Sequence, residues 1–550
     1  MRRDSESANR LARPIGGETL RLVAASVAAW LCIWPASWAG AVITLDADFD
    51  SGSLCLTPSN ACDDNGVASS VNGNVVTLIG RDNFNAGQWK WVYFQASGVT
   101  GQVVNFEIGD DFTTGSANLV GHKMVYSYDQ QNWSFFDNNA LLGAQNKFVF
   151  SNNAAFTEDT VYVAYGLPYP YQRTVDDTGG IASSPWVSPT TSGNGTLVVG
   201  QSPGGVDDIG RAIAARDLYG FKITDAAASG PKKKIVVSSG VHANETVGNW
   251  TLEGLIEFLV SDELAAAQLR RYAEFYVYPM VNPDGRFAGN NRTTVQVDDV
   301  DPNRAWNPPS YVEPGNTSTV LDVARVGNAM RSDTGQDIDY MIDFHSTVNH
   351  SIPYHHGLIL AEWQSDPFWL AVRSREPAVL TAGAALVDFT AAKFGRDVLG
   401  AEFSATFETL FVADENVDRF LDLGRNFGLA WHDVFHVAAD LNFDGVLNGQ
   451  DWLAFVAAAE TDLAGLSSIE RYERGDLDGD GVNSILDFVL FKQIYLQEHG
   501  AGAFEAMLRQ VPEPNAVSLV LSSGLVLAAV CAHSRRGRPI DFQLLTTSEG

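Results

Sequence analysis

Two side chains that can bind a metal stand three residues apart in the segment VVSSGVHANETVGNW, residues 236–250. An apolar run and a small-residue turn predict the end of a strand, and a helical pattern begins beside His242 and Glu245. Such a turn can present both side chains to one point, where an imidazole and a carboxylate can share a zinc ion. The pair alone is weak evidence, because a chain with 10 histidines and 66 acidic residues can contain His-x-x-Glu by chance.

A third ligand is available in the segment DYMIDFHSTVNH, residues 339–350, where another apolar run ends at His345. Strand ends are the places where an α/β sheet gathers its functional groups. Two imidazoles and one carboxylate would leave one position of a zinc ion open to water, which is typical of a catalytic site. A lone histidine at a strand end is more often a hydrogen-bonded core residue than a metal ligand. Motifs elsewhere in the chain are therefore needed to distinguish these two roles.

The elements that position these residues follow from the change of pattern along the chain. Short alternating runs such as NVVTLIG and VVNFEIG, separated by turn residues, predict an antiparallel β-sandwich over residues 42–180. After a stretch rich in Gly, Ser, Thr and Pro, apolar strands such as KKKIVVSSG and EFYVYPMV alternate with helical stretches. This alternation predicts an α/β domain over residues 195–437.

Two acidic loops of the same length follow, DLNFDGVLNGQD at 440–451 and DLDGDGVNSILD at 476–487, and we interpret them as an internal repeat. Each has oxygen-bearing side chains at positions 1, 3, 5, 9 and 12 and glycine at position 6, as in a loop that wraps a calcium ion. A solvated turn without metal is the alternative. With the backbone carbonyl of position 7, the predicted ligands of two Ca²⁺ ions are Asp440, Asn442, Asp444, Val446, Asn448 and Asp451, and Asp476, Asp478, Asp480, Val482, Ser484 and Asp487.

The repeat resembles a type I dockerin, whose duplicated loop-helix units bind calcium and dock onto a cohesin domain. The resemblance implies a small α-helical calcium-binding domain over residues 438–497. It also implies a cohesin-like partner.

Both ends of the chain carry patterns of targeting segments. Arginines, the apolar run LVAASVAAWLCIW and the small residues PASWAGA predict a signal peptide over residues 1–41, with a retained membrane anchor as the alternative. The segment VPEPNAVSLVLSSGLVLAAVCAHSRRGR, residues 511–538, resembles an exosortase-type sorting signal, with a plain transmembrane anchor as the alternative. These patterns predict a bacterial protein that is secreted or attached to the cell envelope and handled by sorting machinery at the membrane.

Composition narrows the classes of partner. The net charge of −30 opposes binding to phosphate backbones, so we expect no nucleic-acid partner. Cys55 and Cys62 are the two cysteines outside the terminal segments, and they can close a small disulfide loop or remain a reduced pair.

Five motifs in a fixed order make residues 202–437 resemble a zinc metallocarboxypeptidase, and this resemblance implies that the central sheet of the α/β domain is mixed. They are His-x-x-Glu at 242–245, NPDG at 282–285, an arginine followed by DPNR at 301–304, HS at 345–346, and FE at 407–408. The β-rich first domain, with WVYFQASG and YGLPYPYQRT, resembles the sandwich that precedes the catalytic domain in the cytosolic carboxypeptidases.

The resemblance implies a role for each matching residue. Zinc would bind to His242, Glu245 and His345. Asp301 would accept a hydrogen bond from His242, and Asn303 and Arg304 would hold the terminal carboxylate of the substrate. Arg292 would polarise the scissile carbonyl, and Glu408 would be the general base that activates a zinc-bound water. The implied function is a zinc-dependent carboxypeptidase that removes C-terminal residues from peptides or proteins.

Several alternatives stay open at this stage. The family usually has a mobile tyrosine shortly before the catalytic glutamate, but no tyrosine lies between Tyr354 and Glu408, which puts closure over the substrate in doubt. Lys393 and Arg396 can face an acidic terminal residue of the substrate or can be charges on a helix surface. The same site would also suit an amidase acting on cell-wall peptides, or a catalytically silent module that binds carboxylate termini.

Overall fold

The computed structural model describes most of the chain between residues 42 and 511. The described ranges are 42–62, 66–82, 91–109, 121–142, 147–295, 300–306, 320–347, 355–383, 386–411 and 415–511. The predicted signal peptide, residues 1–41, and residues 512–538 of the predicted C-terminal segment lie outside these ranges. Within the described ranges, no helix has both the length and the apolar character needed to cross a bilayer.

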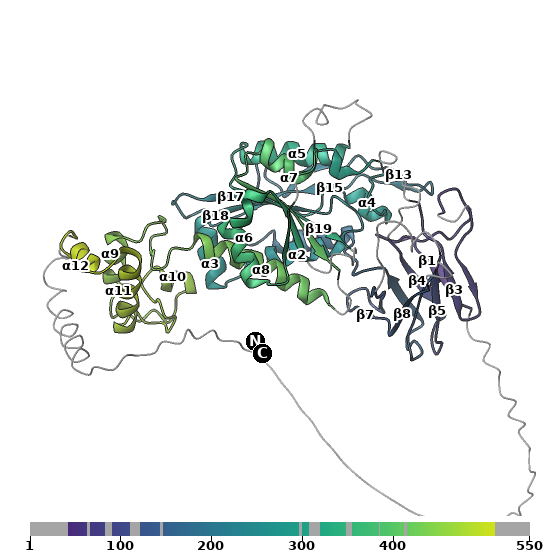
Figure 1. Ribbon diagram of the computed structural model, residues 1–550, viewed down its shortest axis with the longest axis horizontal. Helices are drawn as coiled ribbons and strands as arrows, with labels where there is room; N and C mark the ends of the chain where they lie inside the picture. Colours follow the sequence, from purple (N-terminus) through teal and green to yellow (C-terminus); the bar gives the residue numbers. More distant parts are fainter. Residues whose placement is uncertain are drawn as a thin grey trace, which may run out of the picture. The chain divides into compact units, whose positions relative to one another are not determined.

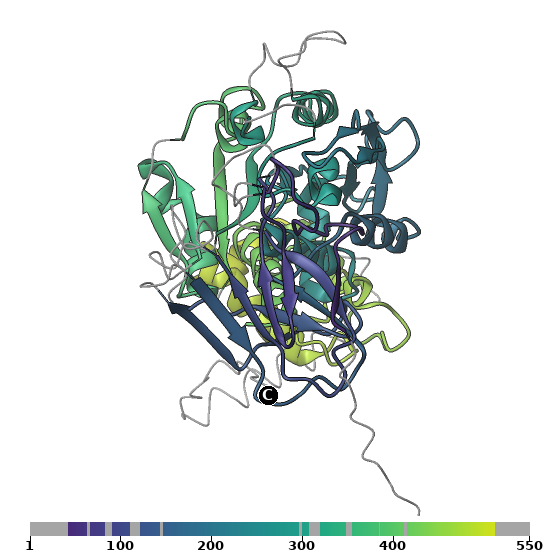
Figure 2. The same ribbon diagram turned by 90° about the vertical axis from the view of Figure 1, so that its right-hand side faces the viewer.

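The first domain consists of two five-stranded sheets, drawn in purple to blue in Figure 2. Their strand orders are β1-β4-β10-β6-β7 and β2-β3-β5-β9-β8. Phenylalanine side chains such as Phe94, Phe106 and Phe150 are buried in its core. The prediction of a β-rich first domain is therefore confirmed. The strand bounds are β1 Thr44–Asp46, β2 Ser70–Asn72, β3 Val75–Leu78, β4 Tyr93–Ser97, β5 Asn105–Ile108, β6 Val125–Ser127, β7 Ser134–Phe135, β8 Asn138–Leu142, β9 Lys147–Ser151 and β10 Thr160–Ala164.

Most of a helix, α1 (Tyr171–Ile181), lies in the range 42–180, which was predicted to form a β-sandwich. The carboxylate of Asp50 in the first domain accepts hydrogen bonds from the backbone N–H of Tyr171 at 3.2 Å and of Gln172 at 2.8 Å. These bonds satisfy N–H groups that have no partner within the first turn of a helix. The local sequence contains Gly179 and Gly180, which are poor helix formers, so contacts from outside the helix stabilise it.

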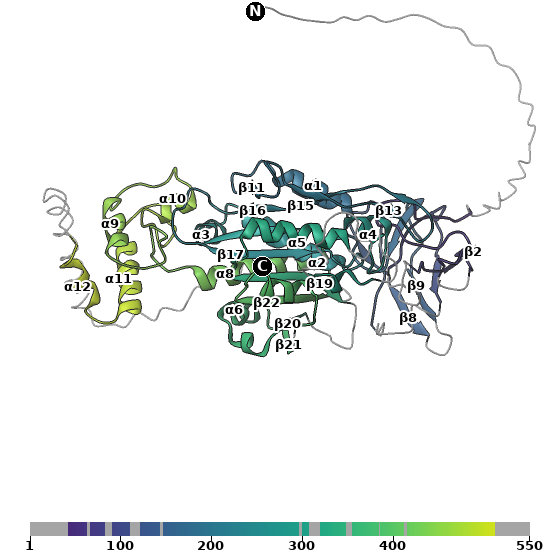
Figure 3. The same cartoon turned by 90° about the horizontal axis from the view of Figure 1, so that it is seen from above.

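An eight-stranded mixed sheet forms the centre of the second domain, in the order β11-β16-β18-β17-β19-β22-β20-β21 (Figure 3). The strands β18, β17, β19 and β22 run parallel, so their carboxyl ends meet at one edge. This edge is where parallel sheets present functional groups. The bounds are β11 Val187–Pro189, β16 Phe221–Ile223, β17 Lys233–Ser239, β18 Ala273–Tyr278, β19 Tyr340–Thr347, β20 His356–Ile359, β21 Leu380–Gly383 and β22 Phe403–Leu410.

Helices cover both faces of this sheet (Figure 1). One face packs on α2 (Thr246–Val260), α3 (Leu264–Tyr272), α6 (Pro367–Arg375) and α8 (Val417–Phe435), and the other on α5 (Leu321–Thr334) and α7 (Ala391–Asp397). Successive residues of β17 alternate between the two cores, because Ile235 and Val237 lie in one and Val236 in the other. The prediction of an α/β domain with a mixed sheet is confirmed.

Shorter elements complete the second domain. Two two-stranded sheets pair β12 with β15 and β13 with β14. The remaining bounds are β12 Val198–Gln201, β13 Gly205–Val206, β14 Ala212–Ile213, β15 Asp217–Tyr219, α4 Pro283–Ala288, η3 Pro302–Arg304 and η5 Ala361–Ser365.

The core of the first domain continues into the second. Val247 and Trp250 from α2 and Phe420 from α8 belong to the same cluster of buried side chains as the phenylalanines of the β-sheets. The disulfide between Cys55 and Cys62 is formed in the first domain, which decides between the two alternatives for this pair.

The last described region is helical. It contains α9 (Gly449–Ala457), α10 (Ser468–Tyr472), α11 (Ile485–His499) and α12 (Ala503–Leu508), with α9 and α11 side by side in Figures 1 and 3. Aromatic side chains, including Trp452, Phe455, Phe491 and Phe504, pack between the helices.

Candidate metal centre

Three potential metal ligands meet at the carboxyl edge of the central sheet. His242 lies in the turn after β17, Glu245 directly precedes α2, and His345 is on β19. The first turn of α2 lies against the end of β19, since a Cβ atom on Gly248 would be only 2.7 Å from the carbonyl oxygen of His345. A glycine at this position therefore allows the helix that follows Glu245 to approach the strand that carries His345.

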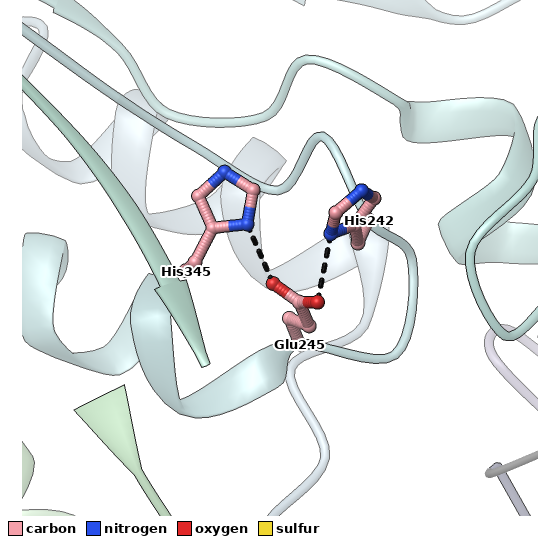
Figure 4. Close-up of side chains that lie close together, drawn as sticks. All are labelled: His242, Glu245 and His345. Atoms are coloured by element: carbon pink, nitrogen blue, oxygen red, sulfur yellow. Dashed lines mark hydrogen bonds and ion pairs between the residues drawn. The ribbon is translucent and has the colours of Figure 1, made fainter. Parts of the chain in front are cut away.

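The two imidazoles face the same carboxylate from opposite sides, as Figure 4 shows. Nδ1 of His242 is 2.7 Å from Oε1 of Glu245, and Nδ1 of His345 is 2.7 Å from Oε2. One ligand atom from each residue lies within 4.8 Å of the others, and all three residues are buried. A nitrogen–nitrogen–oxygen set of this kind can surround a single zinc ion.

A carboxylate lies beside the second ring nitrogen of each histidine. Nε2 of His242 is 2.9 Å from Oδ1 of Asp301, and Nε2 of His345 is 2.6 Å from Oδ2 of Asp343. Such contacts orient an imidazole so that the nitrogen facing the carboxylate carries the proton and the other is free for a metal. Asp301 is the residue for which the sequence predicted a hydrogen bond from His242, and it lies beside that ring. Asp343 was missed, although a residue two positions before His345 on a strand points to the same face.

Negatively charged side chains outnumber positively charged ones around the two histidines. Although burial opposes it, the carboxylates of Asp343 and Glu245 raise the pKa of His345 well above its usual value. Burial also opposes the shift at Glu245, yet the two imidazoles lower its pKa well below the usual value. The anionic form of Glu245 and the carboxylates beside both histidines suit a divalent cation, so the residues present fit zinc.

Glu408 lies next to this cluster on β22. Its Cα is paired with that of His345 in the parallel ladder between β19 and β22, so the two side chains point to the same face of the sheet. Burial, and then the negative charge of Glu245, raise the pKa of Glu408 to about 7. A half-buried carboxyl group with such a pKa can exchange protons near neutral pH.

The predicted substrate-binding residues occupy different positions relative to the cluster. Arg292 lies within it, because its guanidinium donates to Oδ2 of Asp301 at 3.1 Å and to Oε1 of Glu245 at 3.3 Å. Asn303 is buried, with Nδ2 3.3 Å from Nε2 of His345 and Oδ1 accepting from the N–H of Ala391. Arg304 has 47% of its side chain exposed, so its guanidinium is open to solvent at the edge of the site.

The two basic residues considered for specificity are paired with acidic neighbours. Lys393 forms ion pairs with Asp388 at 3.0 Å and Asp397 at 3.6 Å, and Arg396 also pairs with Asp397 at 2.5 Å. This arrangement favours the interpretation that they are charges on the surface of α7.

The two acidic loops differ in how their carboxylates are placed. In the second loop, Asp476, Asp478 and Asp487 offer oxygen atoms within 4.8 Å of one another, and this is the one other potential metal cluster among the residues that the structure describes. In the first loop, Asp440 accepts from the phenolic O–H of Tyr272 on α3 at 2.9 Å and from the N–H of Gly445. In both loops, the residue at position 9 caps a helix, Asn448 for α9 and Ser484 for α11.

Comparison with known protein families agrees with this geometry. Residues 204–363 match the family described as zinc carboxypeptidase, and residues 45–165 match the cytosolic carboxypeptidase N-terminal domain. The chain carries a zinc carboxypeptidase domain behind a cytosolic-carboxypeptidase N-terminal domain. The motifs predicted a peptide hydrolase, and the matches to the zinc carboxypeptidase family and to cytosolic carboxypeptidases support this enzyme class.

Curated relatives of the zinc carboxypeptidase domain cover only part of the chain. Human cytosolic carboxypeptidase 6 is 29% identical over 199 residues, which are 36% of this chain and 38% of that protein. Cytosolic carboxypeptidase 2 of Xenopus tropicalis is 28% identical over 243 residues, which are 40% of this chain and 24% of that protein. The chain therefore spans less than two thirds of the length of these relatives.

Solved structures share the fold. A metallo-carboxypeptidase from Burkholderia cenocepacia superposes with a TM-score of 0.55 at 21% identity and covers 72% of this chain and 100% of that one. A metallo-carboxypeptidase from Pseudomonas aeruginosa gives a TM-score of 0.54 at 20% identity and covers 71% of this chain and 98% of that one. At this level of identity, the match extends to the fold alone.

One prediction is contradicted by these relatives. The terminal segments were interpreted as signals for secretion or attachment to the cell envelope, whereas the curated relatives are cytosolic carboxypeptidases. The prediction depended on an apolar stretch with flanking arginines near each chain end, together with small residues at one end and a Pro-Glu-Pro motif at the other. Such patterns do not by themselves establish where a protein is located. We therefore do not retain the prediction of export.

Proposed function

We propose that the protein is a zinc-dependent metallocarboxypeptidase that hydrolyses the C-terminal peptide bond of peptides or proteins. The observation that carries this proposal is the convergence of His242, Glu245 and His345, with Glu408 beside His345 in the strand register. When bound, the zinc ion would supply Lewis-acid polarisation of water and of the scissile carbonyl.

The polar residues of the site divide into two tasks. We assign Arg292 to the scissile carbonyl, because its guanidinium lies among the metal ligands and can donate to a developing oxyanion. We assign Asn303 and Arg304 to the terminal carboxylate of the substrate. The exposed guanidinium of Arg304 supports this assignment, because a planar donor open to solvent can form two parallel hydrogen bonds to a carboxylate.

Glu408 would act as the proton carrier of the reaction. It takes a proton from the attacking water as the new carbon–oxygen bond forms, and it delivers this proton to the leaving nitrogen as the carbon–nitrogen bond breaks. One group can perform both transfers when its pKa lies near the working pH, and burial next to Glu245 raises the pKa of Glu408 to about 7. A cation at the neighbouring ligands would lower this pKa and favour the base form.

The direct test is hydrolysis of matched peptides with free and amidated C-termini, together with a metal analysis of the purified chain. We expect release of the terminal residue from the free peptides only, and one zinc ion per chain. Cleavage of amidated peptides at the same rate, or full activity after zinc has been removed with a chelator, would contradict the proposal.

We further propose that the acidic loops bind calcium, one ion in residues 440–451 and one in residues 476–487. The three gathered carboxylates of the second loop support this, because Ca²⁺ prefers several oxygen ligands of this kind. Calorimetric titration of the metal-free chain with CaCl₂ is expected to show two binding events. A chain that takes up no calcium at millimolar concentration would rule this out.

The remaining predictions stay with these proposals. We divide the chain into a β-sandwich domain at 42–180, a catalytic domain at 195–437 and a calcium-binding repeat at 438–497. The cohesin-like partner rests only on the resemblance of the repeat to dockerins.

A further inference from the structure

The segment that leads to Arg292 is held by the first domain at consecutive backbone positions. The N–H of Ser51 donates to the carbonyl oxygen of Phe287 at 3.0 Å. The next carbonyl, of Ala288, accepts from Nη1 of Arg81 at 2.7 Å and from Nη2 of Arg211 at 3.0 Å. Three residues separate Ala288, which carries this doubly bonded carbonyl, from Arg292 in the metal centre.

The following residue, Gly289, is in close contact with the first domain. Its φ of 72° is in the left-handed region, where it ends α4, and a Cβ atom there would lie 2.3 Å from the carbonyl oxygen of Gly52. Glycine is therefore required both by the backbone conformation and by the contact. A shift of the segment around Gly52 would be transmitted directly to the turn before Arg292.

Arg81 has little freedom to move. Its side chain is 1% exposed, and besides Ala288 it contacts the carboxylates of Asp207, at 3.3 Å, and Asp208. Asp207 is held in turn by Arg211, whose Nε donates to Oδ2 at 2.7 Å. A buried guanidinium requires partners for its charge and its N–H groups, and the Ala288 carbonyl is one of the partners of Arg81.

The backbone of the first domain supports Arg81 as well. Arg81 forms an antiparallel bridge with Cys62, and the N–H of Asp82 donates to the carbonyl of Ala61 at 2.9 Å. Cys62 is tied to Cys55 by the disulfide. The strand segment that carries Arg81 is thus fixed by a covalently closed loop.

Beyond Gly289, backbone hydrogen bonds hold the segment that leads to Arg292 in the metal centre. The N–H of Asn290 donates to the carbonyl of Gly285 at 2.9 Å, and the N–H of Asn244 donates to the carbonyl of Asn291 at 2.7 Å. Asn244 stands between the ligands His242 and Glu245 in the chain. Arg292 therefore follows a residue that is bonded directly to the ligand turn.

We infer that Arg81 is a positioning residue for Arg292, so that the first domain forms a working part of the active site rather than an appended module. The inference rests on the proposed function, in which Arg292 stabilises the oxyanion. Arg81 acts by fixing the Ala288 carbonyl, and through it the turn that aims the Arg292 guanidinium at the substrate.

The test is a double-mutant cycle with Arg81→Met and Arg292→Ala in the full chain loaded with zinc. We expect Arg81→Met to lower kcat roughly tenfold with little change in KM, since small misplacements of a catalytic group have effects of this order. In the Arg292→Ala background, the same substitution should have almost no further effect. Arg81→Lys, which keeps the charge beside Asp207 but loses the planar fork, should lie between the wild type and Arg81→Met.

Arg270→Met is the matched control, because Arg270 is also 1% exposed and donates to the carbonyls of Leu259 and Ser261, away from the metal centre. It should lower the thermal stability and leave kcat near the wild-type value at temperatures well below Tm. Hydrogen exchange gives a second readout that does not depend on activity. The amides of residues 289–294 should exchange faster in Arg81→Met than in Arg270→Met.

The results of these experiments test the positioning role of Arg81 and the proposed function separately. A normal kcat in Arg81→Met, additive losses in the cycle, or unchanged exchange in residues 289–294 would overturn the positioning role of Arg81. An inactive wild type with bound zinc would overturn the proposed function, and the exchange measurement would still decide whether Arg81 holds the Arg292 segment.

Discussion

The metal centre and the second acidic loop each bring potential metal ligands together. The ligands of the metal centre are much farther apart in the sequence than those of the loop. The ligands of the metal centre span residues 242–345 and come from two strand ends and a helix start. The carboxylates of the loop all lie within residues 476–487. The metal centre therefore depends on the register of β17, β19 and β22, whereas the loop depends mainly on its own backbone.

Hydrogen bonds within the loop illustrate this independence. Oδ1 of Asp487 accepts from the N–H of Leu477 at 2.7 Å, and Oδ2 accepts from the N–H of Ser484 at 2.8 Å. In the metal centre, by contrast, each ligand is held by a residue distant in sequence, as with Glu245 and His345. A long-range site is more sensitive to substitutions elsewhere in the fold, and the following predictions test this difference.

Replacement of Glu408 by Gln should have the largest effect. The amide cannot take up a proton, so we expect kcat/KM to fall by about 10³-fold while zinc remains bound. Steady-state kinetics and metal analysis of the same preparation check both parts. Glu402→Gln, an exposed carboxylate just before β22, is the matched control and should be near wild type. Activity within a few fold of wild type in Glu408→Gln would remove Glu408 from the mechanism.

Replacement of Asp343 by Asn tests the support of the metal ligands. Its Oδ2 is 2.6 Å from Nε2 of His345, and loss of such an acceptor typically weakens metal binding by about 10–100-fold. Competition with a fluorescent zinc chelator measures the change. Asp339→Asn, on a partly exposed residue just before β19, serves as the control. An unchanged zinc affinity would show that His345 is oriented by other contacts.

Replacement of Asp478 by Ala should affect the loop and leave the metal centre intact. Asp478 is exposed and belongs to the gathered carboxylates, so its loss should weaken calcium binding. At a calcium concentration one hundred times Kd, binding stabilises the folded state by about 2.7 kcal/mol, and the variant should lose much of the resulting rise in Tm. Zinc content and kcat should not change. Glu498→Gln, exposed on α11, is the control.

Much of the metal centre could be predicted because its motifs are local. His242 and Glu245 follow one strand end, and His345 closes another, which made them candidates. The resemblance to zinc metallocarboxypeptidases was needed to assign them to one ligand set. The position of Asp343 could also have been predicted, because residues two positions apart on a strand lie on the same face. A carboxylate within an apolar strand is, however, easily assigned to the core. The resemblance implied Glu408 as the general base, but its pairing with His345 was not predicted, because strand register is set by contacts that no local pattern contains.

Contacts between the two domains could not be predicted from the sequence. Arg81 and Ala288 are separated by 207 positions along the chain, and neither stands in a motif that indicates the other. Helix α1 was missed for the same reason, since its first turn is capped by Asp50 and its own sequence contains two adjacent glycines. The predicted export failed differently, because it was inferred from targeting-like patterns at the two chain ends and the relatives contradict it.

A third cluster contains carboxylates but no imidazoles, and its pKa shift can be compared with the shift of Glu245 in the metal centre. Asp177 on α1 lies near Glu253 on α2, and Arg173 pairs with both, at 3.4 Å to Asp177 and 2.9 Å to Glu253. Burial, and then the negative charge of Glu253, raise the pKa of Asp177 to about 7. In this cluster, repulsion between carboxylates shifts a pKa upward, whereas the imidazoles of the metal centre shift the pKa of Glu245 downward.

The raised pKa gives a pH dependence with a defined sign. Between pH 4 and 7, roughly, the folded chain binds more protons at Asp177 than the unfolded chain, whose aspartates titrate near 3.9, so the free energy of unfolding falls as the pH rises through this window. Asp177→Asn removes the charge and should raise Tm at pH 8 by on the order of 1–2 °C, after allowance for solvent screening at this partly exposed group, with little change at pH 4. Thermal unfolding followed by circular dichroism at both pH values measures the difference. The neighbouring exposed Asp176→Asn is the control, and an equal gain at pH 4 and pH 8 would show that the effect of Asp177→Asn does not come from its titration.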